Sequence, residues 1–118
     1  MKTNKAKTLA ALAIIAAANP DGFTVDARTL QPIATGYAVA VAETQNSFGE
    51  KGLANVVDYV LRHSGINAFG GWLDTETNRY YYDGTIVVEC LEKAMEIGRA
   101  NGQIAVFDLA NGVEIRIK

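Results

Sequence analysis

Few side chains in this chain could carry catalysis, and they lie far apart in the sequence. Cys90 is the only cysteine and His63 the only histidine, so a zinc site built from several of these residues cannot form. The serines, Ser47 and Ser64, lie outside any G-x-S-x-G motif, and no glycine-rich phosphate-binding loop is present. The sequence therefore favours a non-enzymatic function with no cofactor and no metal.

Carboxylates are the remaining candidates for acid–base chemistry. The chain has 13 Asp and Glu residues, but their pairing depends on the fold and not on sequence spacing. A carboxylate is more often a surface charge than a catalytic group. The conceivable acid–base candidates are Glu43, Asp58, Asp74 and Asp83.

A calcium site is the one metal site that the spacing suggests. Asp74, Glu76 and Asn78 alternate as the ligands of an EF-hand loop do. The sixth position of such a loop requires glycine and the twelfth glutamate, but the chain has Arg79 and Thr85 there. The spacing therefore argues against calcium.

Aromatic residues gather between residues 69 and 84, which hold the only Trp and three of the five Tyr. Trp and Tyr are common in protein interfaces because they provide large, rigid contact area. The polar residues before the preceding helix could line a pocket with them. The candidate binding residues are Phe69, Trp72, Tyr80, Tyr81, Tyr82, Gln45 and Asn46.

The aromatic residues lie on a predicted β-hairpin with strands 68–74 and 79–83. Side chains alternate between the faces of a strand, so Tyr80 and Tyr82 share one face and Tyr81 lies on the other. If one face is buried, the opposite side must meet solvent or a partner.

Residues 1–18 allow two interpretations. Lysines followed by an apolar run and Ala16-Ala17-Ala18 have the layout of a signal peptide, which predicts a secreted protein starting at Asn19. Leu9, Leu12 and other apolar residues also recur at helical spacing, which favours a first helix of the domain.

Two further helices are expected. Ser47 and Glu50 match a capping box at the start of a helix that ends near Ser64. The last helix is expected to start at Asp83 or Thr85 and to run to about Asn101. Cys90 lies in its apolar stripe, which predicts a buried, inert thiol.

Strands are expected at 23–25, 30–33 and 36–44, and the closing segment has Asn111-Gly112 between two alternating runs, typical of a type I′ hairpin. The 118 residues thus predict a single α+β domain, residues 1–118, with three helices packed on an antiparallel or mixed sheet. The expected order is roughly α-ββ-β-α-ββ-α-ββ.

The net charge of −2 argues against nucleic-acid binding, which calls for a basic surface. No apolar run is long enough for a membrane span. Because a single cysteine cannot form an internal disulfide, a cytoplasmic location fits best.

The stretches NPDGFTVD…GYAVAVAETQNSFG and GGW…YYYDGTIVVECLEKAMEIGRANGQIAVFDL cover most of the chain. In them the chain resembles a group of short uncharacterised proteins encoded by phages and conjugative elements of gut bacteria. The resemblance implies an intracellular accessory protein whose N-terminal run is a helix, and it assigns no catalytic residue.

Two function classes follow. The first is a non-enzymatic mobile-element accessory that binds a host or phage protein, with inhibition of a host defence system as one form. Self-association would use the same aromatic residues. The alternative is a small-molecule-binding protein or minor enzyme with a pocket near the Trp/Tyr hairpin.

Overall fold

The computed structural model describes residues 4–117, which form three α-helices and a seven-stranded antiparallel sheet. This confirms the predicted α+β class with three helices, and of the two predicted forms of the sheet, antiparallel or mixed, it is the antiparallel one. The helices are α1 (Asn4–Ala18), α2 (Gly49–Arg62) and α3 (Leu91–Ala100), and a 3-10 turn, η1, spans Ala42–Thr44. The strands are β1 (Gly22–Asp26), β2 (Tyr37–Ala40), β3 (Ser47–Phe48), β4 (Ala68–Asp74), β5 (Arg79–Val88), β6 (Ala105–Asp108) and β7 (Val113–Arg116).

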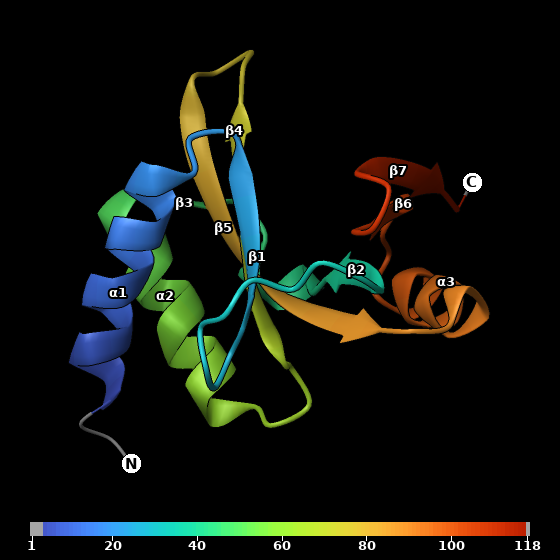
Figure 1. The fold of residues 1–118 in the computed structure, drawn as a ribbon, viewed down its shortest axis with the longest axis horizontal. Coiled ribbons are helices and arrows are strands. Elements are labelled where there is room, and N and C mark those ends of the chain that lie inside the picture. The colour runs from blue at the N-terminus through green and yellow to red at the C-terminus, as the bar shows by residue number, and fades with distance from the viewer. Residues whose placement is uncertain (1–3, 118) are drawn as a thin grey trace.

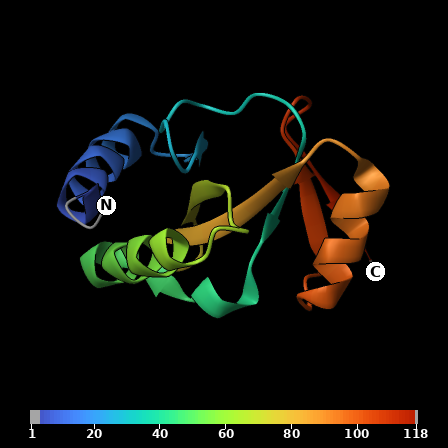
Figure 2. The same cartoon turned by 90° about the horizontal axis from the view of Figure 1, so that it is seen from below.

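The strand order is β1-β4-β5-β2-β6-β7, and the short β3 pairs with β5 beyond the end of β2. The long β5 strand is the axis of the sheet, because β4 pairs along one of its edges and β2 and β3 share the other. Figures 1 and 2 show α1 and α2 beside the β4–β5 hairpin, while α3, β6 and β7 form the other end of the molecule.

Two apolar cores correspond to these two ends. The larger core lies between α1, α2 and the strands β1, β4 and β5, and its largest side chain is Phe69. The smaller core joins α3 to β2 and β6 through Val39, Ala94 and Val106. Both clusters exclude water, and burial of this kind of apolar surface is the main favourable term in folding.

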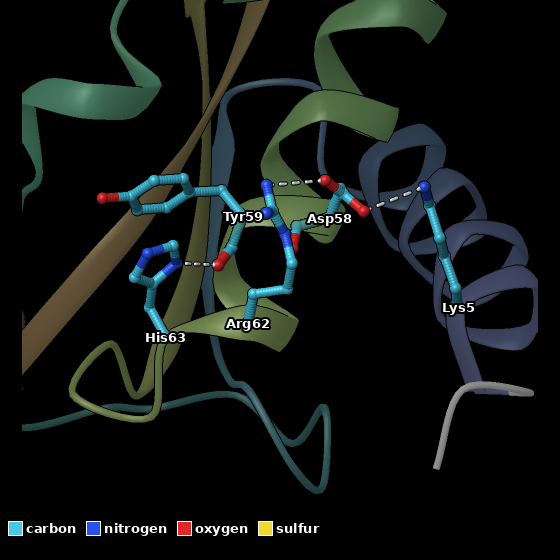
Figure 3. Close-up of polar contacts among 5 residues, drawn as sticks. All are labelled: Lys5, Asp58, Tyr59, Arg62 and His63. Carbon is cyan, nitrogen blue, oxygen red and sulfur yellow. Dashed lines mark hydrogen bonds and ion pairs between the residues drawn. The ribbon is translucent and has the colours of Figure 1, made fainter.

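The N-terminal segment is a folded helix of the domain, as the second interpretation predicts. Leu12 of α1 is fully buried in the larger core. Figure 3 shows Asp58 of α2 between Lys5 of α1 and Arg62, with N–O distances of 3.3 and 3.0 Å. Both cations hold the pKa of the Asp58 carboxyl below its usual value. The hydrogen bond from Lys5 has the largest effect, followed by the charge of Arg62. Cleavage before Asn19 stays a prediction that N-terminal sequencing of native protein tests.

The predicted capping box at α2 is wrong. Ser47 is buried and pairs with Tyr82 as part of β3, while Phe48 is the N-cap residue and makes no side-chain hydrogen bond to the helix. A β-carbon on Gly52 would lie 2.5 Å from the Ser47 backbone, so the helix packs tightly against this strand. Strand pairing therefore takes the place of the local cap.

The predicted start of α3 is also wrong, because β5 continues through Val88 and the helix begins at Leu91. Thr85, Ile86, Val87 and Val88 are β-branched and pair with β2. Cys90 is therefore the exposed N-cap of α3 and not a buried member of its stripe.

Three smaller differences concern one turn and two of the predicted strands. Gly112 has a φ of 66° but Asn111 does not have positive φ, and Gly112 N–H donates to Asp108, so the β6–β7 turn is not type I′. Residues 30–33 form a single bridge, Val25 to Pro32, in place of a strand. The predicted strand 36–44 ends at Ala40 and turns into η1.

Candidate functional site

The two faces of the sheet differ because all three helices cover the same one. Tyr82 and Ile86 of β5 pack against the larger core, and Val88, two positions further, packs against the smaller one. Side chains two apart on a strand share a face. We call this covered side the helix face and the opposite side the open face. Since the helices lie outside the two ends of the bent sheet in Figures 1 and 2, the open face lies inside the bend.

Tyr80 and Tyr82 lie on the helix face and have structural environments. Both rings lie 6.4 Å from the Phe23 ring, and the Tyr80 hydroxyl donates to the Asn19 carbonyl at 2.7 Å. Burial, with smaller contributions from Tyr82 and Asp21, raises the pKa of Tyr80 to about 12, and burial also raises the pKa of Tyr82. These two tyrosines therefore close the edge of the larger core.

Tyr81 lies on the open face in the middle of a row of three aromatic rings. Its ring stacks on Trp72 with 5.0 Å between centroids and 18° between planes, and meets Phe48 edge-on at 5.5 Å. Trp72 is 47% exposed and Phe48 41% exposed. The Arg79 guanidinium lies 4.4 Å from the centroid of the Phe48 ring, a cation–π geometry. We call Phe48, Trp72, Tyr81 and Arg79 the aromatic patch.

Sequence reasoning missed Phe48 and Arg79. Phe48 joins the patch because β3 pairs with β5 in the register that sets Phe48 opposite Tyr81. Trp72 lies opposite Tyr81 on the other side. The cross-strand row is thus assembled from segments that are far apart in the sequence, and only the predicted hairpin pair was visible locally.

Gly70 and Gly71 each serve one face of the hairpin. A β-carbon on Gly71 would lie 2.3 Å from the Phe23 ring on the helix face. A β-carbon on Gly70 would lie 2.6 Å from the Asp83 carboxylate on the open face. Gly71 therefore makes room for an aromatic ring, and Gly70 makes room for a carboxyl group.

Asp83 is the one acid–base candidate with a raised pKa. It is partly buried beside the patch, two residues after Tyr81 on the same face, and accepts a hydrogen bond from the Thr85 hydroxyl at 2.5 Å. Burial raises the pKa of Asp83 to about 6, although the hydrogen bond from Thr85 acts in the opposite direction. A carboxyl group with this pKa can exchange a proton near neutral pH.

The other candidate carboxylates have structural or solvent-exposed positions. Asp58 pairs with the two cations described above, and Asp74 accepts hydrogen bonds from Glu76 and Thr77 within the hairpin turn. Glu43 is exposed in η1. Within residues 4–117, no group of three or more His, Cys, Asp or Glu residues is arranged to hold a metal ion.

The remaining predicted site residues do not extend the patch. Phe69 is 1% exposed in the larger core and therefore presents no surface to a partner. Gln45 and Asn46 are exposed in the loop before β3, where Asn46 has a φ of 64°. His63, at the end of α2, stacks on Tyr59 at 3.9 Å and donates to its carbonyl, as Figure 3 shows.

The surface has shallow hollows away from the aromatic patch. One of about 290 Å³ lies between α1 and β1, beside Ile15 and Phe23, and one of about 570 Å³ lies beside Lys7 and Leu61. In the described part of the chain, no helix has the length and apolarity needed to cross a bilayer. The comparisons add no assignment, because no family model, no curated protein and no solved structure matches this chain.

Proposed function

We propose that the chain is a non-enzymatic accessory protein that binds another protein through the aromatic patch. The observation that carries this proposal is the row of rings on the open face, in which Tyr81 stacks on Trp72 and meets Phe48 edge-on, and in which Trp72 and Phe48 are exposed. Rings of this kind are already ordered by one another, so binding costs them little conformational entropy.

The composition of the patch supports a protein partner. Trp, Tyr and Arg are the residue types most enriched among interface positions that dominate binding energy. Arg79 stands at the margin of the rings, where its guanidinium can donate to a partner while remaining over Phe48. Phe107 of β6, 41% exposed, lies on the same open face because it pairs with Ala38, which in turn pairs with Val87.

The identity of the partner rests on the resemblance to proteins of phages and conjugative elements. This resemblance favours a cytoplasmic partner that is a host or phage protein. The specific form of the function would then be inhibition of a host defence system. The exposed thiol of Cys90 fits a reducing compartment, where a free surface cysteine persists unoxidised.

The test is comparative capture with the wild-type chain and with Trp72→Ala and Tyr81→Ala as baits. Leu61→Ala is the matched control, because Leu61 is also an exposed apolar side chain but lies on α2. We expect the patch variants to lose a protein that the wild type and the control retain, with about 2 kcal/mol or more lost per anchor in a purified binding assay. Equal capture by all four baits contradicts the proposal.

A small-molecule site is the second candidate, and the raised pKa of Asp83 beside Tyr81 is the observation that favours it. Such a site would bind a ligand against the rings, with the carboxyl group as its polar partner. Thermal stabilisation by a metabolite, lost in both Trp72→Ala and Asp83→Asn, would support this alternative. Stabilisation that survives both substitutions removes it.

A further inference from the structure

The outer edge of β7 carries unpaired backbone groups. β7 is the last strand of the sheet and pairs only with β6 among the described strands. The Ile117 N–H donates to the Ile104 carbonyl across this pair. Since backbone groups alternate in direction along a strand, the N–H and C=O groups of Glu114 and Arg116 point away from β6.

Of the two ends of the strand order, the one at β1 is covered, which leaves β7 as the exposed end. Along β1, the Ile33 N–H donates to the Thr24 carbonyl, and the Asp26 N–H donates to Gln31. Residues 30–33 therefore follow the outer side of β1. An uncovered edge strand is a template for pairing with another strand.

We infer that β7 pairs with β7 of a second copy of this chain, antiparallel and with the two-fold axis at Ile115. In this arrangement Glu114 lies opposite the partner's Arg116, and Arg116 lies opposite the partner's Glu114. The outward N–H and C=O groups of Glu114 then hydrogen-bond with those of the partner's Arg116, and those of Arg116 bond with the partner's Glu114. Both side chains are exposed in the single chain and free to meet a partner.

Charge selects this register over its neighbours. Antiparallel pairing keeps outward-pointing residues opposite each other, so the register can shift only in steps that centre it on Glu114, Ile115 or Arg116. Centring on Glu114 sets Glu114 against the partner's Glu114, and centring on Arg116 sets two arginines together. Only the Ile115 centre pairs opposite charges, and like charges directly opposite are destabilising.

Apolar residues on the helix face fit the same register. Val113 is 49% exposed, although its neighbours Ile115 and Ile117 pack against the smaller core. With the axis at Ile115, Val113 lies opposite the partner's Ile117, which covers part of its exposed surface. A two-fold contact of this kind is self-complementary, as isologous dimers require.

The inference is independent of the proposed function, because β7 and the aromatic patch belong to opposite ends of the sheet. Glu114 pairs with Phe107, which lies on the open face, so the charged pairs lie on that side as well. The dimer would join two open faces in one continuous sheet and present two aromatic patches.

The test is the mass of the full-length protein by light scattering, over a range of concentrations up to about 100 μM. The wild type is expected at twice the mass of one chain. Glu114→Arg alone and Arg116→Glu alone set like charges opposite each other, so each is expected to weaken the dimer about tenfold or more. An equimolar mixture of the two variants restores opposite charges at both positions, and is expected to form a heterodimer.

Arg99→Glu is the matched control, because Arg99 is exposed on α3 and gives the same change in net charge as Arg116→Glu. Circular dichroism of each variant checks that the fold is intact. A monomeric wild type at the highest concentration overturns the inference. A dimer that both charge reversals leave unchanged, or that Trp72→Ala dissociates while they do not, also overturns it.

Discussion

The two faces of the β4–β5 hairpin use the same kind of residue for opposite purposes. On the helix face, Tyr80 and Tyr82 pack on Phe23 and close the larger core. On the open face, Tyr81 stacks on Trp72, which remains 47% exposed. Neighbouring tyrosines thus differ in role because strand alternation assigns them to different sides and helices cover only one. The comparison teaches that the helix face contributes most of the packing of the hairpin, while the open face leaves aromatic rings exposed.

Truncating the core residue of β4 should show the largest difference between the faces. Phe69→Ala removes the largest side chain of the core and is expected to lower the free energy of unfolding by about 3–5 kcal/mol. Trp72→Ala, three residues away on the open face, is expected to cost about 1 kcal/mol. Chemical denaturation of both variants measures the difference, and equal losses would show that the open face is also part of a core.

Gly70 and Gly71 allow the two faces of the hairpin to be compared by the effect of one added methyl group on stability. Gly71→Ala sets a methyl group against the Phe23 ring and is expected to cost about 1–3 kcal/mol of unfolding free energy. Gly70→Ala meets only the ends of two side chains, the Asp83 carboxylate at 2.6 Å and the Thr85 hydroxyl at 2.9 Å, which can shift more easily than a packed ring, so its cost should be smaller. Thermal unfolding monitored by circular dichroism ranks the two, and the reverse ranking contradicts the assignment of faces.

The pH dependence of stability reports on Asp83. Burial raises its pKa from 3.8 to about 6, so the carboxyl group is harder to ionise in the folded state than in the unfolded state. This group therefore lowers stability as pH rises from about 4 to about 6, and its cost is constant above that range. Asp83→Asn should be more stable than wild type by about 1–2 kcal/mol at pH 7 and equally stable below pH 4. Unfolding of both proteins across this range is the measurement, and a gap that does not change with pH would refute the burial of the carboxyl group.

Removing the hydroxyl group of Tyr80 or Tyr81 is expected to change the free energy of unfolding least. Tyr80→Phe deletes the hydrogen bond to the Asn19 carbonyl and is expected to cost about 1 kcal/mol of unfolding free energy. Tyr81→Phe, on the open face, is the matched control and should cost less. Calorimetry of both variants resolves such a difference, and a larger loss in Tyr81→Phe would reverse the roles assigned to the two tyrosines.

The sequence predicted the elements whose signals are local. The β4 strand matches the predicted 68–74. The helical spacing of Leu53, Val56, Val57, Val60, Leu61 and Ser64 predicts one buried stripe; in α2 the first four of these are buried, but Leu61 is 44% exposed and Ser64 lies beyond the end of the helix. Predictions failed where a distant strand competes with a local signal. Ser47 has the pattern of a cap but is taken into β3 by pairing with Tyr82.

The candidate site was predicted only in part, for the same reason. Trp72 and Tyr81 were legible because they belong to one hairpin, and Phe69 was included because sequence clustering does not separate the faces of a strand. Phe48 could be found only from the pairing of β3 with β5. The environment of Asp83 depends on Gly70 across the strand pair, which no spacing rule along the chain reveals.

By itself, the sequence determined the α+β class, the hairpin, the alternation of Tyr81 against its neighbours and the lack of multi-residue catalytic motifs. These properties follow from local backbone geometry and residue chemistry, which act over a few positions. The tertiary structure decided which face the helices cover, that Phe48 and Arg79 complete the patch, and that Asp83 is partly buried with a raised pKa. Those outcomes depend on which distant segments share a face, and pairing between distant strands is set by the packing of the whole chain.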